Sequence, residues 1–189
     1  MTRSGRGQGR AEQPAGHQLT GYAYVSLRSV GDQPGVHAPH YLSPWRTLHD
    51  GAYISPAKFI PTSQSALPVM SVTDGTAVYR IYGFNYTTSV PFPAETNRPA
   101  AGSRPYVALP YIEFDGTGQL VSGGPNGQPE LIPITEGSVN YARNVNTKNA
   151  VRAAAQVMER PPGNTTANFS LVSVDRLTGR ARVERRKVQ

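Results

Sequence analysis

The 189-residue sequence contains no cysteine, and no uninterrupted apolar run approaches the ~20 residues that a membrane-spanning helix requires. The first absence excludes disulfide bonds, thiol catalysis and zinc sites built on cysteine. No segment has the charged-then-apolar layout of a signal peptide. As written, the chain is expected to be soluble.

Charged residues make up only 16% of the chain and hydrophobic residues 38%, whereas there are 19 glycines and 17 prolines. Such frequent interruption excludes long helices but permits short strands joined by turns. The larger apolar residues lean toward Val, Ile and Tyr, which favour sheets. The composition thus predicts a mostly β fold, α+β at most: a small antiparallel sheet with one short helix and long loops rich in Pro and Gly.

The net charge of +7 is concentrated at the two ends of the chain. Residues 1–10 carry +3 and residues 176–189 carry +5, whereas the body between them is nearly neutral. Residues 1–18 have almost no apolar side chain and are predicted to be a disordered basic segment, followed by a single β-rich domain over 19–189. Basic ends favour a polyanionic partner, although a solubilising tail from an arginine-rich proteome has the same composition.

Alternating polar and apolar residues, bounded by turn residues, predict a series of short strands. These cover residues 22–30, 45–48, 52–54, 76–84, 106–114, 119–121, 131–134, 138–143, 169–175 and 181–188. Apolar residues at helical spacing predict one helix over 149–160, ended by Pro161-Pro162-Gly163. The last two strands are separated by four residues ending in Gly179, which predicts a C-terminal hairpin.

Residue types that carry catalysis are present, but not in catalytic patterns. His37 and His40 have a metal-like spacing, yet a proline lies between them, and solvated loop histidines are the simpler interpretation. Glu113 and Asp115 share a strand face, but acids beside Gly116 are typical of turns. No nucleophile elbow or phosphate-binding loop is found. We therefore predict a protein that is not an enzyme, with no cofactor, no metal and no small-molecule substrate.

The candidate binding residues are basic and lie in the predicted hairpin: Arg176, Arg180, Arg182, Arg185, Arg186 and Lys187. Because successive side chains of a strand alternate, Arg180 and Arg182 are expected on one face, about 6.6–7 Å apart. That spacing approximates one phosphate step of a nucleic-acid strand, and guanidinium groups bind phosphate in a bidentate manner. The alternative is a charged edge strand that protects against aggregation.

Several short motifs follow one another in a characteristic order: His49–Pro56, Tyr111–Asp115 with Gly118, Glu136–Ser138, Phe169–Asp175 and Thr178–Val183. Their order, within residues 45–60 and 105–188, resembles the headgroup of prepilin-like proteins, namely pseudopilin H and FimT-type minor pilins. Gly179-Arg180-Ala181-Arg182 matches the Gly-Arg-x-Arg motif that contributes to DNA binding in FimT-type members. The cleavage site and the N-terminal apolar helix of that family are not found in this sequence.

The resemblance implies a non-enzymatic structural or interaction subunit of an envelope filament, either a type II secretion pseudopilus or a type IV pilus. It implies a periplasmic or extracellular place in the bacterial cell envelope, with other protein subunits (filament or homo-oligomer) as partners. Two alternatives stay open. One is a protein that binds DNA or another polyanion through the arginine cluster. The other is a viral shell or other structural assembly protein whose residues 1–18 contact packaged nucleic acid.

Overall fold

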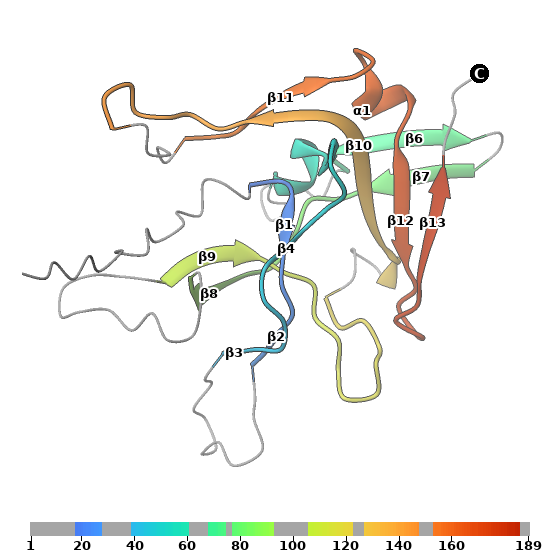
Figure 1. The fold of residues 1–189 in the computed structure, drawn as a ribbon. Coiled ribbons are helices and arrows are strands. Elements are labelled where there is room, and N and C mark those ends of the chain that lie inside the picture. The colour runs from blue at the N-terminus through green and yellow to red at the C-terminus, as the bar shows by residue number, and fades with distance from the viewer. Residues whose placement is uncertain are drawn as a thin grey trace, which may run out of the picture.

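The computed structural model describes residues 18–27, 39–60, 68–74, 77–92, 106–122, 127–147 and 153–185 (Figure 1). Within them the chain is mostly β, with small antiparallel sheets and one short α-helix, which confirms the predicted fold class. Residues 1–17 of the predicted disordered segment lie outside this description. Gln18 is held in place, because its side-chain Nε2 donates to Ala153 O at 3.1 Å and its Oε1 accepts from Ala155 N at 2.9 Å.

The largest sheet is organised around β10, the 11-residue strand Glu130–Asn140. Every pairing in it is antiparallel, and it comprises β10 with β5 (Ala52–Ile54), β11 (Gln156–Glu159) and β12 (Ser170–Val174), and β12 with β13 (Ala181–Arg185). Ile134 is opposite Ile54 on one side and Ser170 on the other, so β5 and β12 lie on opposite edges of β10.

Among the described residues, four two-stranded antiparallel sheets accompany this central sheet. They are β1 (Gly21–Tyr22) with β4 (Arg46–Thr47), β2 (Val25–Ser26) with β3 (His40–Tyr41), β6 (Met70–Asp74) with β7 (Ala77–Ile81), and β8 (Thr87–Pro91) with β9 (Tyr106–Pro110). Helical segments with described bounds are the 3-10 turn η2 (Pro56–Phe59) and α1 (Asn164–Ala167). Figure 1 shows the β6–β7 hairpin beside β10 and β12, with β8 and β9 on the opposite side of the molecule.

Side chains alternate between two faces of the central sheet, and the two faces differ in burial. On the first, Leu131 and Leu171 pack with Phe169 and with Val72 and Ile81 of the β6–β7 hairpin, and all five are buried. We call this the core face. Its burial explains why the alternating sequence pattern predicted β7 and β12, within 76–84 and 169–175.

The opposite face carries a row of apolar side chains across β5, β10, β12 and β13. The register places Ile132 beside Val172 and Val172 beside Val183, and it places Ile134 beside Ile54. Ile54, Ile132, Ile134 and Val172 are only partly buried, and Val183 is 67% exposed. We call these five residues the open face.

The predicted helix over 149–160 is wrong where the structure describes it. Residues 156–159 form β11, which pairs with residues 137–140 of β10, and Met158 is 59% exposed. An isolated helix of that length is marginal in water, whereas the far end of β10 offers backbone groups to a neighbouring strand. The α-helix lies later, at Asn164–Ala167.

The predicted strand 131–134 and residues 138–140 of the predicted strand 138–143 belong to the single strand β10, which continues through Gly137 without a turn. A Cβ atom at Gly137 would overlap the carbonyl oxygen of Met158 on β11. The glycine therefore permits the close approach of a neighbouring strand and makes no turn.

A buried ion pair joins η2 to the first residue of β10. The ammonium of Lys58, 1% exposed, contacts the Glu130 carboxylate, donates to Tyr82 O at 2.7 Å and lies 4.9 Å from the centre of the Phe84 ring. Burial lowers the pKa of Lys58 and raises the pKa of Glu130, and in each case the partner's charge opposes that change. Each side chain is therefore favoured in its charged form by the opposite charge of its partner.

Removal of one member of this pair leaves an uncompensated buried charge. We expect Lys58→Met or Glu130→Leu to lower the free energy of unfolding by about 3–5 kcal/mol. The double variant removes both charges and is expected to cost much less than the sum of the two single changes. Guanidinium chloride unfolding followed by circular dichroism measures all three; additive losses would contradict the coupling.

Candidate nucleic-acid interface

The predicted C-terminal hairpin is confirmed by the pairing of β12 with β13, from Ser170 opposite Arg185 to Val174 opposite Ala181. The two strands differ in environment, because Leu171 and Val174 of β12 are buried whereas all five residues of β13 are exposed. The hairpin is therefore anchored through its inner strand. Its outer strand presents its side chains to solvent.

The turn of the hairpin is organised by Asp175. One carboxylate oxygen, Oδ1, accepts from Thr178 N at 2.8 Å and from Thr178 Oγ1 at 2.7 Å, and Asp175 N donates to Arg180 O at 2.9 Å. These hydrogen bonds from Thr178 hold the pKa of the Asp175 carboxyl below its usual value, and the charge of Arg182 acts in the same direction. The turn thus fixes the position of Arg180, immediately before β13 begins.

A second turn of the same kind supports the first. Asp115 Oδ1 accepts from Thr117 Oγ1 at 2.7 Å, from Thr117 N at 2.8 Å and from Gln119 N at 2.9 Å, and these contacts lower the pKa of Asp115. Leu120, the next residue, donates its N–H to Arg176 O at 2.9 Å. The hairpin turn is therefore hydrogen-bonded to the chain that follows the Asp115 turn.

The two turns meet at a pair of glycines. Gly179 has a left-handed φ of 62°, and a Cβ atom there would overlap the carbonyl oxygen of Gly118 and lie 3.2 Å from Phe114 Cδ1. Only glycine combines this backbone conformation with such a close approach. The glycine of the Gly-Arg-x-Arg motif therefore has a structural role, which is to allow the close contact between the two turns.

Four of the six predicted basic residues are placed by the structure in this one hairpin. Arg176 lies in the turn, Arg180 immediately precedes β13, and Arg182 and Arg185 lie within it, all of them exposed. Across the described ranges, none of these four guanidinium groups donates a hydrogen bond or forms an ion pair within 4 Å. Arg186 and Lys187 lie outside the described residues.

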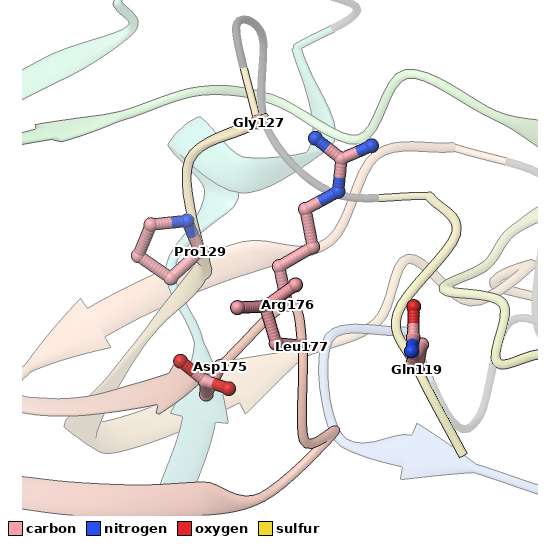
Figure 2. Close-up of a pocket in the computed structure, with 6 residues that line it drawn as sticks. All are labelled: Gln119, Gly127, Pro129, Asp175, Arg176 and Leu177. Atoms are coloured by element: carbon pink, nitrogen blue, oxygen red, sulfur yellow. The ribbon is translucent and has the colours of Figure 1, made fainter. Parts of the chain in front are cut away.

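Arginine 176 borders a shallow cavity of about 420 Å³, which is also lined by Gln119, Gly127, Pro129, Asp175 and Leu177 (Figure 2). Its side chain points toward Gly127 and away from Asp175 in this view. A Cβ atom at Gly127 would lie 2.5 Å from Arg176 Nη1, so the glycine leaves room for the guanidinium. This juxtaposition was not predicted from the sequence, because the glycine-rich run around Gly127 resembles an ordinary turn.

The remaining candidates for chemistry do not assemble into a site in the described part of the chain. His37 lies outside it, and no three His, Asp or Glu side chains within it are placed to hold a metal ion. None of the helices in the described ranges has the length and apolar character needed to cross a membrane.

No family model, curated protein or solved structure matches this chain. The hairpin offers several unpaired guanidinium groups on a docked, defined turn, which suits an extended anion such as a phosphate backbone.

Gly179→Ala tests whether the glycine contact fixes the hairpin. We expect a loss of about 2–4 kcal/mol in the free energy of unfolding, because the variant combines an unfavourable φ with a backbone overlap. Gly163→Ala shares the positive φ of 81° but has open space around it, and should lose only about 1 kcal/mol. Gly116→Ala has neither feature and should be nearly neutral. Thermal and chemical unfolding of the three variants measures the difference, and equal effects would contradict the docking.

Proposed function

We propose that this chain is a non-enzymatic assembly subunit, similar in role to the headgroup of a pseudopilin or minor pilin in an envelope filament. It packs on other protein subunits through the open face of its central sheet. The observation that carries the proposal is the incomplete burial of Ile54, Ile132, Ile134 and Val172 together with the exposure of Val183.

An antiparallel sheet that faces water on one side normally carries polar residues there. Here five apolar residues on this face span four neighbouring strands, beside Ser170, which lies opposite Ile134, and Arg185, which lies opposite Ser170. Burial of apolar surface is worth roughly 25 cal/mol per Å², so a partner that covers this row gains free energy, chiefly at Val183. Contiguous apolar surface of this kind marks sites of protein interaction.

The cellular setting of the proposal follows the resemblance in sequence. A pseudopilus or type IV pilus places the chain in the bacterial cell envelope, on its periplasmic or extracellular side, with other filament subunits as partners. A viral shell uses the same kind of surface but produces closed particles. Electron microscopy of purified assemblies separates the two, because filaments favour the first and regular closed particles the second.

Val172→Lys tests the open face by placing a charge in the middle of the row. We expect the chain to be recovered in the sheared surface-filament fraction of its source cells, and the variant to be lost from that fraction. Val78→Lys is the matched control, because Val78 is 58% exposed on β7, away from the open face. Immunoblots of the filament fraction, with circular dichroism to verify folding, provide the measurement. Wild-type protein confined to the soluble cytosol would contradict the proposal.

A second function is favoured by the exposed guanidinium groups of the hairpin. Arg180 and Arg182 are separated by one residue, follow Arg176 of the turn in the sequence, and form no hydrogen bond or ion pair within 4 Å among the described residues. Unpaired arginines at a fixed turn bind phosphate groups without first breaking internal contacts. We propose that this cluster binds DNA, as the Gly-Arg-x-Arg motif does in the proteins it resembles.

The double change Arg180→Ala with Arg182→Ala tests DNA binding. If each arginine contacts one phosphate, affinity for a short duplex falls and the log–log salt dependence becomes shallower by about 1.8. Arg46→Ala with Arg143→Ala removes the same charge from exposed positions outside the hairpin and should leave the slope nearly unchanged. Fluorescence anisotropy at several salt concentrations measures both. Equal effects of the two double variants would reject a specific role for the hairpin.

A further inference from the structure

We infer that β13 is a self-complementary edge by which two copies of this chain pair in antiparallel orientation, centred on Val183. The second copy is one partner for the assembly function proposed above, on which this inference rests. The pairing extends the central sheet across a two-fold axis, so that each copy offers the same strand to the other.

One edge of β13 is unpaired in the described part of the chain, and the register determines which of its backbone groups point outward. In the described part of the chain, β13 pairs only with β12. Because Asp175 N donates to Arg180 O, alternation along the ladder directs the backbone groups of Arg182 and Glu184 toward β12. The N–H and C=O groups of Ala181, Val183 and Arg185 therefore point outward, available to another strand.

The charges on β13 match those of a second copy in this arrangement. With Val183 opposite Val183, Arg182 of one copy faces Glu184 of the second, and symmetry repeats the pair. These residues would occupy the positions of the ladder without direct hydrogen bonds, where opposing side chains lie closest. Opposite charges directly across a sheet attract, with about 0.2–1 kcal/mol for each pair.

The same charges select one register. A shift of two residues in one direction places Arg182 opposite Arg182, although Glu184 then faces Arg180, and a shift in the other direction places Glu184 opposite Glu184. Like charges across a sheet repel, and of these three arrangements the one centred on Val183 places no two like charges of β13 opposite each other. A strand that carries charge of one sign would be a protective edge against all partners. A strand that carries a positive and a negative residue two positions apart repels many other strands but is complementary in charge to its own copy.

The pairing also covers the most exposed residue of the open face. Val183 is 67% exposed, and its side chain lies in the row that continues through Val172 to Ile132. Across the two-fold axis Val183 would meet Val183 of the second copy. The row of apolar side chains would then run without interruption from one copy to the other.

A charge swap tests the pairing by sedimentation equilibrium from about 10 µM to 1 mM. Wild-type protein should form a dimer. Arg182→Glu and Glu184→Arg alone each replace two attractive pairs with two repulsive ones, and each should weaken the dimer by about tenfold or more. The double variant Arg182→Glu with Glu184→Arg restores opposite charges and should dimerise again, with circular dichroism to verify folding.

Val183→Pro tests the backbone directly. It removes an N–H group that points away from β12, so the hairpin should persist while the dimer is lost. Arg182→Pro is the matched control, because it removes an N–H that bonds to β12 and should also disturb the hairpin. Amide exchange of β12 and sedimentation report the two effects separately. A Val183→Pro variant that dimerises like the wild type would overturn the inference.

The outcomes for the edge and for the filament are distinct. A chain that is recovered in filaments yet stays monomeric at 1 mM overturns the edge pairing and leaves the assembly function standing. A chain that dimerises with charge-swap rescue but is never recovered in filaments supports the edge and contradicts the filament proposal. A double variant that stays monomeric beside a dimeric wild type would falsify the register.

Discussion

The pairing of β10 along both of its edges is the constraint on which the rest of the molecule depends. Residues 130–134 pair with β12, residues 134–136 with β5 and residues 137–140 with β11, so segments far apart in the sequence meet on one strand. Even Pro133 fits this arrangement. Its carbonyl accepts from Ser55 N, and its nitrogen, which has no hydrogen to donate, lies on that same side of β10, away from β12. The ladder that carries the hairpin is therefore uninterrupted.

This arrangement determines what is left exposed. The β6–β7 hairpin covers the core face, and the buried pair of Lys58 and Glu130 joins η2 to the start of β10. The open face then remains partly exposed, and β13, furthest from β10 on the side of β12, pairs with no further strand in the described ranges. The contact between Gly118 and Gly179 holds the turn, so the arginines of the hairpin project from a fixed frame rather than from a loose tail.

The sequence was informative where local pattern and tertiary environment agree. Residues 169–175 and 181–188 alternate and flank a turn, and the hairpin forms there because β12 also has a buried face to satisfy. The apolar spacing of 149–160 fits a helix equally well, and only the unpaired end of β10 decides for a strand at 156–159. The contact of Arg176 with Gly127 and the burial of Lys58 depend on packing between distant segments, which no local pattern records.

Arg182 belongs to both surfaces proposed for the hairpin, and this links them thermodynamically. In an edge-paired dimer, Glu184 of the second copy neutralises Arg182, so a phosphate that needs Arg182 competes with the pairing. A phosphate held by Arg176 and Arg180 does not compete, because neither residue lies within β13. The two-fold axis would instead bring two such arginine pairs onto one particle and raise avidity for a long polyanion. If DNA weakens dimerisation, Arg182 binds phosphate. If DNA strengthens dimerisation, the phosphate is held by Arg176 and Arg180.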